Sequence, residues 1–168
     1  QDIILASLFT TLMILGAYIT IPFPFLPVTM QPVFCVLAGL IAGPRIGALS
    51  MTAYAILGLS GIPVFARGGG ITYVFNPSFG FIIGFIACAY IIGRISRSRY
   101  GNKKAANLIA ALTGLASLYL IGMVYMALIL RFYMGNEEAS FWYVTISNIP
   151  YFIKDLVLFI AAAFISIP

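Results

Sequence analysis

SFGFIIGFIACAYIIGRISRSRYGNKK, residues 78–104, joins an apolar run to a cluster of basic residues. Residues 78–93 carry no charge, whereas residues 94–104 contain five lysines and arginines. An uncharged run that approaches about 18 residues predicts a membrane-spanning helix, and lysine and arginine are enriched in loops on the cytoplasmic side. The stretch therefore predicts a helix that crosses a membrane and ends at its cytoplasmic face.

The composition of the whole chain agrees with a membrane protein. Of its 168 residues, 62% are hydrophobic and 8% are charged, and the mean hydropathy is +1.10. An ordinary soluble domain is about one-quarter charged. The apolar runs are long and do not alternate, so we expect an all-α integral membrane protein. We interpret the first run as a helix rather than a secretory signal, because more spans follow it.

Turn residues divide the chain into six candidate spans, which we assign to a single domain over residues 1–168. The predicted spans are residues 3–21, 32–43, 46–60, 78–93, 105–132 and 141–166. With six spans, Arg45 and the basic loop after residue 93 lie on the same side, and both termini are cytoplasmic. The acidic pair Glu137 and Glu138 then lies outside.

The outer loop between the third and fourth spans has an unusual composition for a simple connection. Its sequence, VFARGGGITYVFNPSFG at residues 64–80, combines three glycines with aromatic and polar side chains. Consecutive glycines let main-chain N–H groups approach a ligand, and aromatic walls with a few polar groups are typical of small-molecule pockets. A flexible external loop is the alternative interpretation. The candidate binding residues here are Arg67, Gly68, Gly69, Gly70, Tyr73, Asn76 and Phe79.

A second outer loop, PFPFLPVTMQP at residues 22–32, contains four prolines. Prolines stiffen the chain, and the Gln31 carboxamide offers both a donor and an acceptor to a ligand. The loop is either a shaped lid over a binding site or a rigid connector between the first two spans.

Two charged residues, Lys154 and Asp155, stand near the middle of the last span. A charge at that depth costs at least about 2.5 kcal/mol and usually faces a cavity. Neighbours on a helix lie about 100° apart, so we expect the two to be poorly placed to satisfy each other and at least one to reach another partner. A ligand is one candidate; an interhelical pair or a lysine that extends to the interface is the alternative.

Small residues in the first span, Ala6, Ser7, Thr10 and Thr11, recur at four-residue spacing. Small residues let helices approach closely in lipid. They serve either packing within the bundle or docking of a partner membrane subunit.

Several functions are not supported by the residues present. The chain has no histidine and no phosphate-binding GxxxxGK[ST] loop, and Cys35 and Cys88 stand alone in apolar runs, where we expect them to pack. We therefore expect no catalytic site, no metal and no cofactor. The net charge of +5 comes mainly from one loop and indicates topology rather than nucleic-acid binding.

Four motifs follow one another in a characteristic order: IPFPFLPVTMQ at 21–31, AGLIAGPRIGAL at 38–49, YAILGLSGIPVFARGGG at 54–70 and NPSFGFIIGF at 76–85. Together they resemble the BioY family, the biotin-binding membrane subunits (S-components) of energy-coupling-factor transporters. The later segment IPYFIKDLVLFIAA, residues 149–162, resembles the terminal helix of that family, which is built around an aspartate.

The resemblance implies a six-helix protein of a bacterial cytoplasmic membrane that captures biotin from outside. It also implies two kinds of partner, a transmembrane coupling subunit and two ATPase subunits. Asp155 then occupies the family's aspartate position, and the small residues of the first span lie where the coupling subunit docks. The alternatives are a capture subunit for another vitamin and a membrane assembly subunit that transports nothing.

The chain differs from many family members at one position near the expected site. They carry a lysine three residues after the aspartate, whereas Leu158 stands here and Lys154 precedes the aspartate. We therefore hypothesise that Arg67 or Lys154 binds the ligand carboxylate and that Asp155 accepts a hydrogen bond from a ureido N–H.

Overall fold

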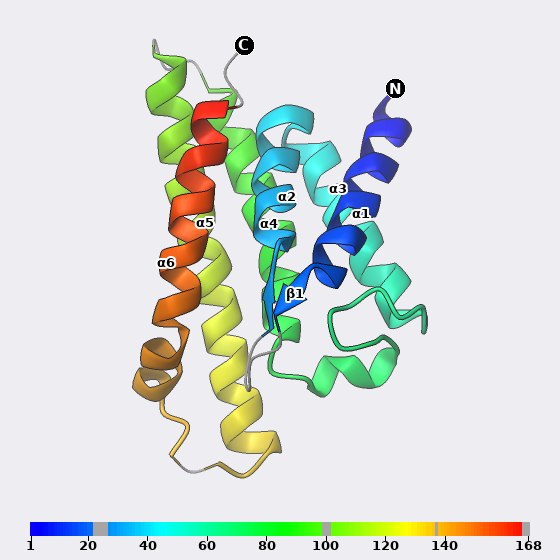
Figure 1. Ribbon diagram of the computed structural model, residues 1–168, viewed down its shortest axis with the longest axis vertical. Coiled ribbons are helices and arrows are strands. Elements are labelled where there is room, and N and C mark those ends of the chain that lie inside the picture. Colours follow the sequence, from blue (N-terminus) through cyan, green and yellow to red (C-terminus); the bar gives the residue numbers. More distant parts are fainter. Residues whose placement is uncertain (22–26, 99–101, 137, 166–168) are drawn as a thin grey trace.

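The computed structural model describes residues 1–21, 27–98, 102–136 and 138–165 and consists of helices packed side by side (Figure 1). It confirms the six predicted spans as six helical segments, with boundaries shifted by a few residues. The segments are α1 (Asp2–Tyr18), α2 (Gln31–Leu37) continued by the π-helical turn η1 (Ala38–Ala42), α3 (Pro44–Leu59), α4 (Phe79–Ser96), α5 (Lys103–Leu128) continued by η3 (Ile129–Tyr133), and α6 (Phe141–Ile165).

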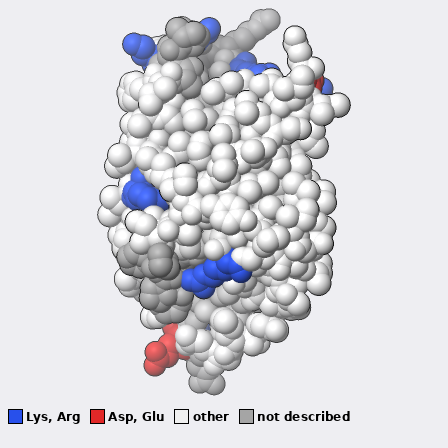
Figure 2. All heavy atoms as spheres, turned by 45° about the vertical axis from the view of Figure 1, so that its right-hand side comes forward, with Lys and Arg blue, Asp and Glu red and all other residues white. Residues whose placement is uncertain are grey.

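The surface of the bundle suits a lipid environment. Among the described residues, α4, the continuous helix Lys103–Tyr133 and α6 are long and apolar enough to cross a membrane, and Asp2–Tyr18 and Gln31–Ala42 are shorter apolar helices. Large apolar side chains on these helices are exposed, for example Ile4 at 73% and Val157 at 62%. The face in Figure 2 is largely uncharged between its two ends.

Charged side chains gather at the two ends of the molecule. Most lysines and arginines lie at the end where both termini lie, Figure 2 shows two further basic patches on the face between the ends, and an acidic patch lies at the other end (Figures 1 and 2). The Asn102 side chain accepts hydrogen bonds from the first N–H groups of α5 and so begins that helix at the basic end. This agrees with the prediction that the basic loops lie on the same side of the bundle. Their cytoplasmic location stays a prediction. Arg99 and Glu137 lie outside the described residues.

Glycines bring the helices of the core close together. A side chain at Gly39 would meet Ile92 at 2.8 Å, and one at Gly84 would meet Leu118 at 2.9 Å. A Cβ atom at Gly93 would overlap the Pro44 backbone nitrogen, so the backbones of α4 and the start of α3 cross in close contact. In the absence of water, close packing of this kind is what holds membrane helices together.

A short hairpin, which the sequence analysis did not anticipate, precedes α2. Strands β1 (Thr20–Ile21) and β2 (Val28–Thr29) pair antiparallel, with Thr20 opposite Thr29. The Met30 N–H donates to the Gly16 carbonyl and fixes the hairpin to the end of α1. Most of the proline-rich loop, residues 22–26, lies outside the described residues, so the predicted lid is not tested there.

The glycine-rich segment folds back onto α3 in a closed turn. Phe65 and Gly68 exchange main-chain hydrogen bonds, and the Gly70 N–H donates to the Gly58 carbonyl at 2.7 Å. Gly68 and Gly70 have φ angles of +111° and +106°, which L side chains rarely adopt. The following 3₁₀ helix, η2 (Ile71–Phe75), leads into α4. The glycines therefore form part of a closed, hydrogen-bonded turn rather than an open loop.

We expect Gly93→Ala to destabilise the protein, because the new methyl group would meet main-chain atoms that cannot rotate away. Overpacking of this kind costs roughly 1–3 kcal/mol, and thermal unfolding in detergent would show a lower midpoint. Gly47→Ala is the matched comparison and should lower the midpoint less, since a methyl group there would lie 3.2 Å from its nearest main-chain neighbours, which is tight but not overlapping. Equal midpoints for the two variants would contradict the close crossing of α3 and α4.

Candidate ligand-binding cavity

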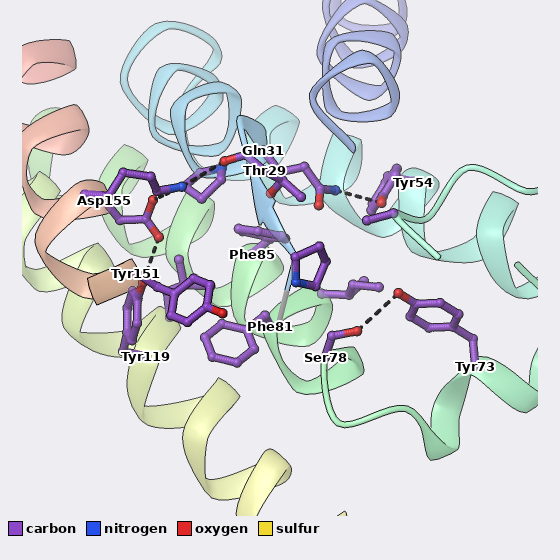
Figure 3. A pocket seen from close by; sticks show the side chains of 16 residues that line it. Thr29, Gln31, Tyr54, Tyr73, Ser78, Phe81, Phe85, Tyr119, Tyr151 and Asp155 are labelled. Carbon is purple, nitrogen blue, oxygen red and sulfur yellow. Dashed lines mark hydrogen bonds and ion pairs between the residues drawn. The ribbon is translucent and has the colours of Figure 1, made fainter. Parts of the chain in front are cut away.

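A cavity lies beneath the β1–β2 hairpin, between α2, α3, α4, α5 and α6 (Figure 3). Its free volume is about 50 Å³, and it is partly open to solvent. Its lining residues are Pro27, Thr29, Gln31, Pro32, Tyr54, Ala66, Tyr73, Ser78, Phe81, Ile82, Phe85, Leu118, Tyr119, Tyr151, Lys154 and Asp155.

The charged pair of α6 forms one end of the cavity. The Lys154 Nζ atom lies 2.7 Å from Asp155 Oδ1 and donates a hydrogen bond to the Thr29 carbonyl of the hairpin at 2.8 Å. The expectation that the two neighbours are poorly placed to satisfy each other is therefore wrong, because the long lysine stem spans the angle between them. The expectation that at least one reaches another partner is confirmed by Thr29.

Asp155 is only 4% exposed, and its two oxygens are satisfied differently. Oδ2 accepts a hydrogen bond of 2.8 Å from the Tyr119 hydroxyl. Oδ1 has the charge of Lys154 nearby but, among the described residues, no donor in hydrogen-bonding geometry. A buried carboxylate oxygen in this state can accept a hydrogen bond from a ligand N–H.

A glutamine–tyrosine pair holds the start of α2 against α3. Gln31 Nε2 donates to the Tyr54 hydroxyl at 2.7 Å, and that hydroxyl donates to the Val64 carbonyl at 3.2 Å. Gln31 is 6% exposed, and among the described residues its carboxamide oxygen has no protein donor. The bond to Tyr54 therefore orients the amide so that its oxygen remains available to the cavity.

A hydroxyl chain comes from the segment between η2 and α4. The Ser78 hydroxyl donates to Asn76 Oδ1 at 2.8 Å, so its oxygen is left to accept from the Tyr73 hydroxyl 3.1 Å away. Burial is the largest influence on Tyr73 and raises the pKa of its hydroxyl, while the bond to Ser78 and the charge of Arg67 act in the opposite direction. Tyr73 therefore stays protonated and keeps its role as a donor at neutral pH.

Aromatic rings separate the two polar ends. Figure 3 shows Asp155 and Tyr119 on one side, Tyr73 and Ser78 on the other, and Phe81 and Phe85 between them. The Phe81 and Tyr119 rings meet edge to face with centroids 5.6 Å apart. The arrangement suits a ligand with polar groups at two ends and an apolar middle.

Four of the ten predicted binding residues line the cavity, and the other six lie outside its lining. Asp155, Lys154, Tyr73 and Gln31 are lining residues. Arg67 is exposed next to the lining residue Ala66, and the three glycines form the turn described above. Asn76 holds Ser78, and the Phe79 ring packs on Tyr125. Direct binding by these six stays a prediction.

Several lining residues were missed by the sequence analysis. They include Tyr54, Ser78, Tyr119 and Tyr151, which lie within or beside apolar runs. A tyrosine in the middle of a membrane span carries a signal that could have found them, because its hydroxyl needs a partner there.

The small residues of the first span divide between two faces of α1. Ala6 and Thr10 are buried, and the Thr10 hydroxyl bonds to the Ala6 and Ser50 carbonyls. Ser7 and Thr11 are exposed. Packing within the bundle therefore uses one half of the set and leaves the other half on the surface.

The buried cysteines pack in the core as expected. Cys35 and Cys88 are both 0% exposed and free, and the Cys35 thiol lies 3.4 Å from the Phe85 carbonyl. Among the described residues no three histidine, cysteine or acidic side chains come together as a metal site.

A membrane-embedded helical bundle with a partly open cavity, polar at both ends and aromatic between them, defines a membrane protein that binds a small solute. Comparison with known proteins identifies its family. The sequence profile of the BioY family matches residues 1–168. The chain belongs to the BioY family.

Relatives and a solved structure agree with this assignment. The "Probable biotin transporter BioY" of Lysinibacillus sphaericus is 34% identical over 98% of this chain and 84% of its own length. The "Biotin transporter BioY" of Thermotoga maritima is 30% identical over 99% of this chain and 94% of its own length. A crystal structure of "the S-component for biotin from an ECF-type ABC transporter" shares the fold, with a TM-score of 0.72 and 23% identity over 98% of this chain and 88% of that one.

We expect Lys154→Met to destabilise the protein more than the double variant Lys154→Met/Asp155→Asn. The single change leaves the buried carboxylate of Asp155 without its counter-ion, which costs up to about 3 kcal/mol, whereas the double change removes the charge as well. Thermal unfolding in detergent measures both. A double variant less stable than the single one would show that the ion pair does not neutralise Asp155.

Proposed function

We propose that this protein captures biotin as the substrate-binding subunit of an energy-coupling-factor transporter. The observation that carries the proposal is the buried Asp155 of the cavity lining, whose Oδ1 is paired with the Lys154 ammonium but has no hydrogen-bond partner among the described residues. A ureido N–H is a donor of the required kind. The names of the relatives in the family support the choice of biotin.

The spacing of the polar groups suggests an orientation for biotin. Lys154 and Asp155 are in contact, so both would meet the same end of a ligand. Biotin carries its ureido ring and its carboxylate at opposite ends of an apolar body. If Asp155 accepts a ureido N–H, an N–H of Lys154 that is not bonded to Thr29 is placed for the ureido oxygen and not for the distant carboxylate.

The carboxylate would then lie at the other polar end of the cavity. There the hydroxyl groups of Tyr73 and Ser78 line the wall, and Arg67 is close enough for its charge to act on Tyr73. Of the two basic residues considered from the sequence, this geometry favours Arg67 for the carboxylate. Aromatic rings between the two ends would cover the thiophane ring and the aliphatic chain.

The proposed role requires partners in a bacterial cytoplasmic membrane. The shared fold is that of an S-component from an ABC transporter, and this chain has no phosphate-binding loop of its own. We therefore assign ATP hydrolysis to two ATPase subunits, coupled through a transmembrane subunit. Ser7 and Thr11, on the exposed face of α1, are the part of the small-residue set still open to such a partner. Biotin is the cargo in this scheme, and no cofactor is needed.

We expect calorimetric titration of the detergent-purified protein to show biotin binding that weakens roughly tenfold or more in Asp155→Asn. The variant loses the charged acceptor, and hydrogen bonds to charged groups contribute about 1.5–3 kcal/mol. Glu138→Gln is the matched control, because it makes the same chemical change at an exposed outer position.

The same titration tests the alternatives. Displacement of biotin by thiamine or pantothenate would assign the cavity to another vitamin. No binding of any of the three would favour an assembly subunit without transport activity.

We expect Arg67→Ala to weaken binding of biotin up to about fivefold, since an exposed charge contributes at most about 1 kcal/mol. Binding of biotin methyl ester, which lacks the negative charge, should change little. Arg131→Ala removes the same charge from another exposed position and serves as the control. Equal losses for biotin and its ester would exclude Arg67 as the carboxylate partner.

A further inference from the structure

A second cavity, which the proposed function does not use, opens at the end of the bundle where both termini lie. It has a volume of about 560 Å³ and is formed by α1, η1, α3 and the end of α4. We call it the arginine groove. Its lining residues are Asp2, Leu5, Ile41, Ala42, Pro44, Arg45, Ile46, Gly93, Arg94 and Arg97.

The arginine groove carries positive charge that the protein does not neutralise. Three arginines face a single acidic residue, Asp2. Among the described residues the only ion pair within 4.0 Å is that of Lys154 with Asp155, so none of the three guanidinium groups has a carboxylate partner.

The three arginines are not equivalent. Arg97 lies over Gly43 and donates to the Ile41 and Ala42 carbonyls, at 3.4 and 3.0 Å, which end the π-helical turn η1. Its role is therefore partly structural. Arg45 and Arg94 are exposed, come from the start of α3 and the end of α4, and make no hydrogen bond among those described. They supply the uncommitted cations of the groove.

Apolar side chains lie directly beside these cations. Leu5, Ile41 and Ile46 line the same groove. Ile41 is 55% exposed, so this apolar lining is partly on the surface of the bundle. A soluble anion would gain nothing from this surface, whereas a lipid carries an anionic headgroup and apolar chains in one molecule.

We propose that the arginine groove binds the phosphate diester of an anionic phospholipid. Guanidinium groups match phosphate oxygens in geometry, and basic pockets between membrane helices bind anionic headgroups at the bilayer surface. Arg45 and Arg94 contact the phosphate, Arg97 adds its charge from the floor, and the acyl chains lie along Leu5 and Ile41. A bound lipid would bridge α1, α3 and α4 at the end opposite the acidic outer loop.

Native mass spectrometry of the detergent-purified protein tests the proposal with phosphatidylglycerol and phosphatidylcholine as probes. We expect selective retention of phosphatidylglycerol, reduced roughly twenty-five-fold or more in Arg45→Gln/Arg94→Gln, since each basic residue near a headgroup contributes about a factor of five or more. Lys103→Gln/Lys104→Gln is the matched control, because it removes the same charge from the same end of the bundle, at residues outside the groove. It should retain the lipid.

Further experiments identify the ligand and control for misfolding of the double variant. The single variants Arg45→Gln and Arg94→Gln should each give an intermediate loss, which keeps the test open if the double variant does not fold. Excess inorganic phosphate should not displace the lipid. Equal retention of the two lipids, equal loss in both double variants, or full displacement by inorganic phosphate would each overturn the proposal. The proposal would also be overturned if Arg45→Gln/Arg94→Gln retained the lipid unchanged but no longer bound the coupling subunit. That result would assign the groove to an acidic segment of the coupling subunit.

Discussion

A buried carboxylate inside a membrane bundle is the constraint on which the binding end of this protein depends. Asp155 is 4% exposed in α6, where an unsatisfied charge would be costly. Lys154 neutralises it, Tyr119 of α5 donates a hydrogen bond to it, and Lys154 also reaches the hairpin at Thr29. Satisfying one charge therefore draws two helices and a surface hairpin to a common point, and the cavity lies where they converge.

The helix crossings of the core follow a different principle, which is close approach. Gly39, Gly84 and Gly93 let α4 pack tightly on η1, α5 and the start of α3. The aromatic rings of Phe81 and Phe85 lie in the cavity wall. The bundle therefore combines close helix crossings along α4 with open space beneath the hairpin.

Much of the fold could be predicted from the sequence, because long uncharged runs have few alternatives to membrane helices. The importance of Asp155 and Lys154 could also be predicted, because a charge inside a membrane span is costly and usually faces a partner or a cavity. Their mutual contact was not, because helix geometry describes the backbone and the lysine stem is long enough to cross it. The two-residue strands at Thr20–Ile21 and Val28–Thr29 have no periodic pattern to detect. Tyr119 was missed because a tyrosine in an apolar run does not show from the sequence which partner its hydroxyl meets.

The bond from Lys154 to the hairpin ends on a main-chain oxygen of Thr29, not on a side chain. Every amino acid at position 29 would present the same acceptor. The contact can therefore survive evolutionary drift at that position, and substitutions at 29 and 154 need not be correlated among descendants of one ancestor. An essential attachment of the hairpin would leave no covariation signal, although the lysine at its other end would remain under selection.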